Sequence, residues 1–230
     1  SFMIQLESIT KIYNPGINEV IALNKVSFLI GEGEMLAVIG TSGSGKSTLL
    51  NILGCMDKPS AGKYFLEESD VSGLNKDQLA RIRNRKIGFV FQNYNLLPKL
   101  NALQNVILPL LYRDRVTDIE GKGMEILKKV GLAERAMHKP TELSGGEKQR
   151  VAIGRALITG PSLILADEPT GNLDSKTGDS ILDLFFQLNR EGQTLIVVTH
   201  DLEIAARCKR QIHFKDGCII KDTGSSFSVC

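Results

Sequence analysis

Apolar side chains occupy every second position in one early segment of the chain and form unbroken runs in several later ones. The alternation from residue 25 to residue 30 predicts a half-buried strand. Residues 35–39 are all apolar, as expected of a parallel strand that is covered on both faces. Similar runs at 87–91, 163–166 and 194–199 predict three more strands of the same buried sheet.

Helices are predicted between these strands. After residue 39 the chain passes through a glycine-rich loop into a predicted helix from Lys46 to about Cys55. Another helix spans about Ser175 to Arg190 with its apolar residues on one face. From about Lys76 to Gly160 the chain is mostly helical, and we interpret residues 93–160 as a helical insertion. Near the end, Asp216-Gly217 between two apolar runs predicts a two-residue hairpin turn.

The order of these elements favours an α/β fold. It predicts a mostly parallel sheet with helices on both faces, an N-terminal antiparallel β part and an inserted helical subdomain. We expect the 230 residues to form a single domain. The hydrophobic content of 42% and the charged content of 23% are ordinary for a globular protein. A net charge of +2 is too small to indicate a nucleic-acid surface, so no nucleic-acid partner is expected.

The sequence also limits what the chain does at a membrane. No segment has the roughly 18–20 consecutive apolar residues of a membrane-spanning helix, and no signal-peptide pattern is present. We therefore expect a cytosolic domain that meets a membrane only through a partner. Four cysteines lie far apart without a C-x-x-C pair, which favours reduced thiols over a disulfide or a metal site. They are Cys55, Cys208, Cys218 and Cys230.

A phosphate-binding loop of the form G-x-x-x-x-G-K-[ST] connects a predicted strand to a predicted helix, the context such a loop requires. Its residues are Gly40, Thr41, Ser42, Gly43, Ser44, Gly45, Lys46, Ser47 and Thr48. The glycines let successive backbone N–H groups point at phosphate oxygens, and the helix N-terminus adds its positive dipole. Lys46 is placed to bind the β- and γ-phosphates of a nucleoside triphosphate, and Ser47 to bind Mg²⁺.

Polar residues end the other buried strands, at the edge of the sheet where such folds bind ligands. Asp167 is predicted to bind Mg²⁺, and Glu168 to orient or deprotonate an attacking water. His200 is placed to contact the γ-phosphate, and Gln92 to contact Mg²⁺ or the water. The alternatives are a solvated acidic loop and polar side chains that serve only the fold.

A second anion site is predicted at Ser144-Gly145-Gly146, which precedes a helix from about Glu147 to Leu157. A hydroxyl group and free N–H groups at a helix N-terminus favour phosphate. The chain therefore has two predicted phosphate sites but only one lysine-bearing loop.

Taken in order, the phosphate loop, the segment 143–147 and the acidic strand end at 163–168 resemble the ATPase subunit of ATP-binding cassette (ABC) transporters. The resemblance covers nearly the whole chain. It implies a P-loop NTPase core that hydrolyses ATP with Mg²⁺ as cofactor, in which Glu168, His200 and Gln92 act on the γ-phosphate or the water.

The same resemblance implies a head-to-tail homodimer. Each ATP would lie between the phosphate loop of one subunit and Ser144 and Gly146 of the other. Asp174 would lie in the loop that crosses this interface. Tyr13, which has no obvious strand partner in the sequence, would stack on the adenine; the alternative is an edge-strand tyrosine.

Three phrases, at 51–59, 88–92 and 169–174, resemble the macrolide-exporter and lipoprotein-releasing branch of that family. This branch works with integral membrane permeases, so the chain is expected at the cytoplasmic face of a membrane, bound to a permease. Glu147 and Gly154 depart from the family pattern, in which glutamine and alanine are usual. Glycine in a helix costs up to about 1 kcal/mol relative to alanine.

Two other functional classes stay open. A soluble ABC-type ATPase acting on nucleic acid or ribosomes usually has a long coiled-coil insertion or two tandem cassettes, and this sequence has neither. A P-loop kinase would leave the segment 143–147 and His200 without a role.

Leu96 and Leu97 form an apolar step beside Pro98 in a predicted loop. Such a step has little reason to be exposed unless a partner covers it. We expect it to form, with Leu100–Val106, a groove for a cytoplasmic helix of the permease. The alternative is that both leucines pack under the helical insertion.

Overall fold

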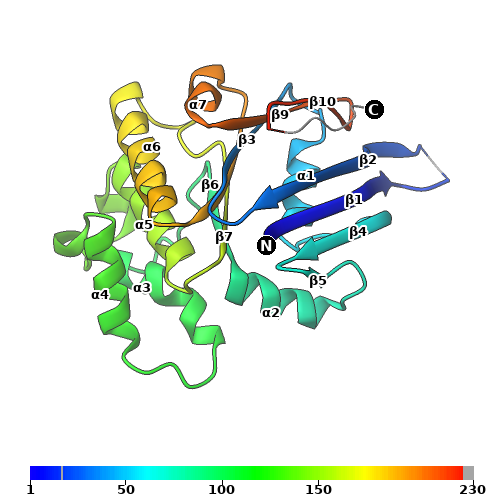
Figure 1. The fold of residues 1–230 in the computed structure, drawn as a ribbon. Helices are drawn as coiled ribbons and strands as arrows, with labels where there is room; N and C mark the ends of the chain where they lie inside the picture. The colour runs from blue at the N-terminus through cyan, green and yellow to red at the C-terminus, as the bar shows by residue number, and fades with distance from the viewer. Residues whose placement is uncertain (17, 225–230) are drawn as a thin grey trace.

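The computed structural model describes residues 1–16 and 18–224, which form two sheets and the helices around them (Figure 1). The first sheet has the strand order β2-β1-β4-β5. Its strands are β1 (Phe2–Tyr13), β2 (Val20–Gly31), β4 (Ala61–Leu66) and β5 (Ser69–Asp70). The second sheet has the order β10-β9-β3-β8-β7-β6. Its strands are β3 (Met35–Gly40), β6 (Ile87–Phe91), β7 (Leu163–Asp167), β8 (Thr194–Thr199), β9 (Arg210–Lys215) and β10 (Cys218–Asp222).

The second sheet is the parallel sheet that the apolar runs predict. Strands β9, β3, β8, β7 and β6 pair in parallel, and only β10 pairs antiparallel, with β9. The β9–β10 hairpin turns at Asp216 and Gly217, whose φ angles of 49° and 77° are the positive values of a type I′ turn. The predicted α/β class and the predicted hairpin are confirmed.

The helices lie between and around the strands. They are α1 (Lys46–Leu53), α2 (Lys76–Lys86), α3 (Ala102–Ile107), α4 (Ile119–Lys129), α5 (Gly145–Leu157), α6 (Ser175–Arg190) and α7 (Leu202–Arg207), with short 3₁₀ turns η1 (Leu108–Tyr112), η2 (Ala133–Arg135) and η3 (Pro140–Glu142). The chain between β6 and β7 is helical or irregular. The division into one domain with an insertion at 93–160 stays a prediction.

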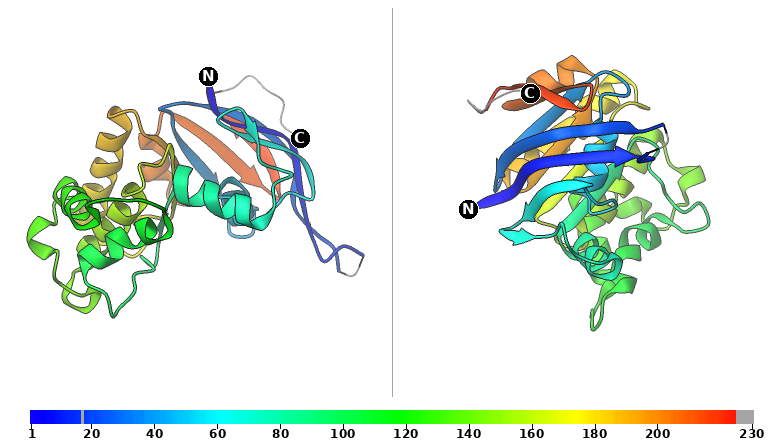
Figure 2. Two further views of the ribbon diagram at one scale, coloured as in Figure 1. Left: turned by 90° about the horizontal axis from the view of Figure 1, so that it is seen from below. Right: turned by 90° about the vertical axis from the view of Figure 1, so that its right-hand side faces the viewer.

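Alternate residues of the central strands enter two separate cores, one on each face of the parallel sheet. In β3, Ala37 belongs to the core shared with α3 to α7, whereas Leu36 and Val38 belong to the core shared with α1, β1 and β2. In β8, Val197 and Ile196 divide in the same way. Figures 1 and 2 show the helical layer on one side of this sheet and the antiparallel sheet on the other. Coverage on both faces explains why these strands are apolar throughout.

Gly154 has a packing role. It lies in the middle of α5, where an added Cβ would come within 3.2 Å of both Ile126 of α4 and Val106 of α3. The absence of a side chain lets the three helices approach closely, which offsets the low helix propensity of glycine. The departure at Gly154 is thus compatible with this local packing.

Cys55 and Cys208 are free thiols, whereas Cys230 lies outside the described residues. Burial raises the pKa of the Cys55 and Cys208 thiols to about 11, which disfavours the reactive thiolate.

Within residues 1–16 and 18–224, no helix is both long enough and apolar enough to cross a membrane.

Candidate functional site

The phosphate loop follows β3 directly and leads into α1. The turn depends on Gly45, whose φ of 104° is left-handed and whose added Cβ would lie 2.6 Å from the carbonyl oxygen of Ala22. The Lys46 ammonium group donates hydrogen bonds to the carbonyl oxygens of Gly40, at 2.6 Å, and Thr41, at 2.8 Å. The loop therefore holds its own lysine in place above the start of the helix.

The loop has the unsatisfied groups of an anion site. No side chain of the described residues caps the N-terminus of α1, which leaves backbone N–H groups of its first turn available. The Ser44 hydroxyl is buried without a hydrogen-bond partner among the described residues. These features fit a bound phosphate chain.

A cavity of about 950 Å³ lies over this loop. It is lined by Val20, Ile21, Ala22, Thr41, Ser42, Gly43, Gly45, Lys46, Ser47, Thr48, Gln92, Asp167, Glu168, His200, Asp216 and Gly217. The structure therefore brings Gln92, Asp167, Glu168 and His200 to the phosphate loop, as their positions at strand ends predict.

The charges in the cavity influence one another. Burial raises the pKa of the Asp167 carboxyl, the negative charge of Glu168 raises it further, and Lys46 opposes both effects. Burial lowers the pKa of Lys46, and the two carboxylates oppose that shift. A carboxylate that is partly desolvated beside a second carboxylate is a site that a cation would stabilise.

Glu168 has a left-handed backbone conformation, and its carboxylate is bound by Thr199 and His200. Its φ is 45°, and its side chain is 17% exposed. One carboxylate oxygen, Oε2, accepts a hydrogen bond from the Thr199 hydroxyl at 3.0 Å. The other, Oε1, accepts from the His200 backbone N–H at 2.9 Å and lies 2.6 Å from His200 Nδ1. The His200 ring itself is 72% exposed and projects into the cavity.

Gln92 is connected to the loop that follows β7. Its amide nitrogen donates to the Asn172 side-chain oxygen at 3.4 Å, and Asn172 donates back to the Gln92 backbone carbonyl at 3.0 Å. Farther along the same segment, Arg155 of α5 donates to the carbonyl oxygens of Tyr94 and Asn95. Asn172, Arg155 and Thr199 were not identified from the sequence, although Thr199 directly precedes His200.

Tyr13 lies at the end of a strand of the first sheet. The sequence suggested no strand partner, but Tyr13 ends β1 and pairs with Val20 of β2, so that expectation is wrong. Its hydroxyl donates to the Asp57 carboxylate at 3.2 Å, and Lys11 donates to the same carboxylate at 2.8 Å. Tyr13 is not among the residues that line the cavity, whereas Val20 is. Its contact with adenine stays a prediction.

The second predicted anion site lies apart from the cavity. Ser144 caps α5, which begins at Gly145 and not at Glu147 as expected, and Glu147 completes a capping box with Ser144. Asp174 caps α6 by accepting from the Thr177 N–H at 3.0 Å, and Thr177 also lies beside Gly146. The residues that line the cavity do not include Ser144, Gly146 or Asp174. The two anion sites of one chain therefore do not form a single pocket.

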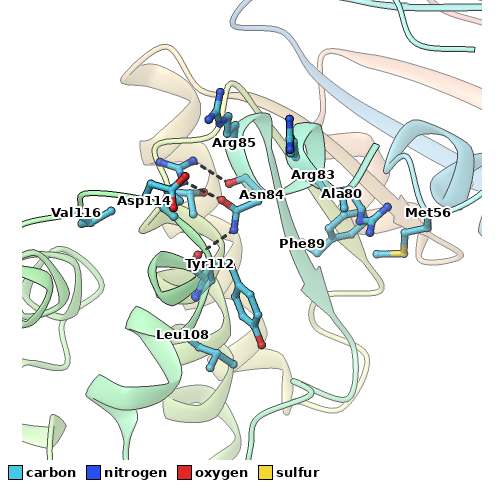
Figure 3. A pocket seen from close by; sticks show the side chains of 14 residues that line it. Met56, Ala80, Arg83, Asn84, Arg85, Phe89, Leu108, Tyr112, Asp114 and Val116 are labelled. Atoms are coloured by element: carbon cyan, nitrogen blue, oxygen red, sulfur yellow. Dashed lines mark hydrogen bonds between the residues drawn. The ribbon is translucent and has the colours of Figure 1, made fainter. Parts of the chain in front are cut away.

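A second cavity lies between α2, η1 and the loop that follows η1, and has a volume of about 1120 Å³ (Figure 3). Four arginines line it: Arg81, Arg83, Arg85 and Arg113. Leu96, Leu97 and the segment 100–106 do not line it, and the groove expected there from the sequence stays a prediction. Leu96 instead packs against the helical core, and Leu97 is 45% exposed.

Comparisons with known proteins agree with this arrangement. A family model described as "ABC transporter" matches residues 23–171. An uncharacterized ABC transporter ATP-binding protein of Thermotoga maritima is 52% identical over 218 residues, which cover 94% of this chain and 93% of that protein. The macrolide export ATP-binding/permease protein MacB of Hyphomonas neptunium is 47% identical over 97% of this chain, but the match spans only 35% of MacB.

A solved structure extends the comparison to the fold. The ATP-binding cassette MJ0796, in a dimeric post-hydrolysis state bound to ADP and Pi, superposes with a TM-score of 0.87. Its sequence is 46% identical, and the match covers 96% of this chain and 97% of that chain.

The shifted pKa of Asp167 leads to a prediction for stability. We predict that Asp167→Asn raises the melting temperature of the nucleotide-free protein at neutral pH. Because the folded-state pKa is raised, the ionised carboxylate opposes folding above the ordinary aspartate range. The gain in melting temperature should shrink as the pH falls below about 4, where the Asp167 carboxyl is protonated in both the folded and the unfolded state of the wild type.

Thermal melts from pH 3 to pH 8 check this prediction, with Asp114→Asn as a control because Asp114 is exposed. A melting temperature of Asp167→Asn that is equal to or below the wild-type value at neutral pH would contradict it.

Proposed function

The chain belongs to the ABC transporter family, and we propose that it is the subunit whose ATP hydrolysis drives an integral membrane permease. The observation that supports this most strongly is the cavity in which Lys46, Asp167, Glu168 and His200 surround one phosphate loop. A lysine and N–H groups for phosphates, together with a carboxylate for water, are what phosphoryl transfer to water requires.

We propose that the phosphates of ATP bind to the backbone N–H groups of the loop and to Lys46. The ammonium group would exchange its bonds to the Gly40 and Thr41 carbonyls for bonds to the β- and γ-phosphates. Ser47, Gln92 and Asp167 offer hydroxyl, amide and carboxylate oxygens, which suit Mg²⁺. Once bound there, the ion neutralises charge that develops on the phosphates.

Glu168 acts on the water in this proposal. Its carboxylate accepts a proton as the water oxygen forms a bond to the γ-phosphorus and the bond to the β-phosphate oxygen breaks, which leaves ADP and phosphate. His200 is exposed enough to turn from Glu168 toward the γ-phosphate. Tyr13 and Val20, at the end of the β1–β2 hairpin, would support the adenine.

The separation of the two anion sites supports a dimer. Because Ser144 and Gly146 do not face the cavity of their own chain, we propose that they complete the cavity of a second copy, head to tail. Asp174 caps the helix beside Gly146 and would lie at that interface. The related cassette MJ0796 is dimeric with ADP and Pi bound.

We assign the permease to the macrolide-exporter and lipoprotein-releasing branch, because MacB is 47% identical over nearly the whole chain. The permease would hold the chain at the cytoplasmic face of the membrane. For the docking site we favour the arginine-lined cavity of Figure 3, which replaces the groove at Leu96 and Leu97. Exposed Arg81 and Arg85 beside the 80% exposed Tyr112 suit an acidic, amphipathic segment.

We predict that Glu168→Gln binds Mg-ATP but hydrolyses it at least about 100-fold more slowly, because an amide does not take a proton from water. Phosphate release and ATP binding, measured on the same preparation, check this. Wild-type turnover in this variant would show that Glu168 is not the base.

A second prediction tests the dimer by complementation. Ser144→Arg should prevent the ATP-dependent dimer while leaving ATP binding to each monomer, and Lys46→Ala should prevent productive ATP binding. A heterodimer of the two variants has one site in which Lys46 and Ser144 are both intact and one site in which both are substituted. Mixing them should therefore restore ATP-dependent association, observed by light scattering. A monomeric enzyme would show no restoration.

A third prediction tests the docking site. Arg81→Glu combined with Arg85→Glu should remove the permease that co-purifies with the wild-type chain from native membranes, because the reversed charges repel an acidic segment. Basal ATPase activity should stay within about twofold of wild type, since surface substitutions change stability little. Lys63→Glu, on the exposed face of β4, is the matched control and should retain the permease. Retention by the double variant would exclude this cavity as the docking site.

A further inference from the structure

Thr199 is a fully buried polar residue at the end of a strand whose four preceding residues are apolar. It is the last residue of β8, its exposed fraction is 0%, and it lies next to Ile39 of β3 in the parallel register. Its hydroxyl oxygen takes part in two hydrogen bonds of 3.0 Å, one with the Asp201 backbone N–H and one with Glu168 Oε2. A buried hydroxyl needs such partners, but these two also determine the direction of its proton.

The direction follows from the chemistry of the two partners. A backbone N–H only donates, so the Thr199 oxygen accepts from Asp201. The hydroxyl has one proton, and a carboxylate oxygen only accepts, so that proton points to Glu168. Asp201 is itself fixed as the N-cap of α7, where its side chain accepts from the Glu203 N–H at 2.8 Å. The start of α7 therefore orients the hydroxyl, and the hydroxyl orients Oε2.

The two oxygens of the Glu168 carboxylate have different surroundings. Oε2 is bound by a residue that is completely buried and has no room to leave. Oε1 is bound by His200, whose ring is 72% exposed. When the His200 ring turns toward a γ-phosphate, Oε1 loses the ring contact and Oε2 keeps its partner. Oε1 would keep the hydrogen bond from the His200 backbone N–H, at 2.9 Å, but the lone pair that faced the ring would become available while Oε2 stays anchored.

We propose that Thr199 is a positioning residue for the hydrolytic reaction: its hydroxyl anchors Glu168 Oε2, so that Oε1 is the oxygen that takes the proton from water. The inference rests on the proposed function of Glu168 as the base. The anchor also opposes movement of a residue whose backbone lies in the left-handed region. A small displacement of a reacting group is enough to reduce a rate strongly.

The test compares Thr199→Val, which keeps the shape and removes the hydroxyl, with Thr199→Ser, which keeps the hydroxyl. Thr199→Val should lower kcat for Mg-ATP by roughly 10–100-fold. KM and the fraction of protein in the ATP-dependent dimer should change by less than about twofold. Thr199→Ser should restore kcat to within about threefold of wild type. In the Glu168→Gln background, Thr199→Val should cause no further loss, because the group that it positions is already gone.

The outcomes separate this inference from the proposed function. If Glu168→Gln leaves hydrolysis unchanged, the proposed function fails. If Glu168→Gln stops hydrolysis but Thr199→Val retains the wild-type kcat, only the role of Thr199 fails. A parallel loss of kcat, ATP affinity and melting temperature in both Thr199 variants would overturn it as well, because that pattern indicates a role in the fold alone.

Should Thr199→Val not fold, Thr199→Cys takes its place, since a thiol is a weaker and longer donor than a hydroxyl. A reduced kcat with unchanged KM in that variant supports the anchor, and a wild-type kcat overturns it.

Discussion

The register of three parallel strands is the constraint on which the rest of the structure depends. Strand β3 pairs with β8 so that Ile39 lies opposite Thr199, and β8 pairs with β7 so that Val198 lies opposite Asp167. This register brings the phosphate loop, His200 and Glu168, which are far apart in the sequence, to one edge of the sheet. A slip by one residue would turn every side chain to the other face, so the chemistry of the site and the packing of the core are set together.

Burial on both faces fixes that register. Val197 packs into the helical core while Ile196 packs into the core beneath the antiparallel sheet, so neither face tolerates the wrong residue. The consequence is that the cavity rests on strands without positive φ angles, whereas positive φ angles occur at its rim. Gly45 with a φ of 104° and Glu168 with a φ of 45° are both rim residues. Rigid support under a strained site is what preorganises polar groups for catalysis.

The sequence predicted the features that depend on neighbouring residues, and it missed those that depend on contacts between distant parts of the chain. The strands, the helix at 175–190 and the Asp216-Gly217 turn follow from local pattern and turn chemistry, and all three were correct. The pairing of Tyr13 with Val20 was missed because register shifts in the β1–β2 pairing obscure the period of two. Leu96 is partly buried against a core that residues from many parts of the chain form, and Thr199 depends on the β7–β8 register. Neither contact leaves a local signal.

The electrostatics of the nucleotide-free cavity connect binding to assembly. Asp167 is shifted against ionisation, Lys46 is shifted against protonation, and the Ser44 hydroxyl lacks a partner among the described residues. Each of these three features raises the free energy of the nucleotide-free cavity, and a bound phosphate chain with its cation would lower it. Binding would therefore stabilise the folded cavity. The same ligand meets only one of the two anion sites of its own chain. In the proposed head-to-tail dimer the second anion site would come from the other copy, and reciprocity would then require that the second copy tightens the binding of the ligand.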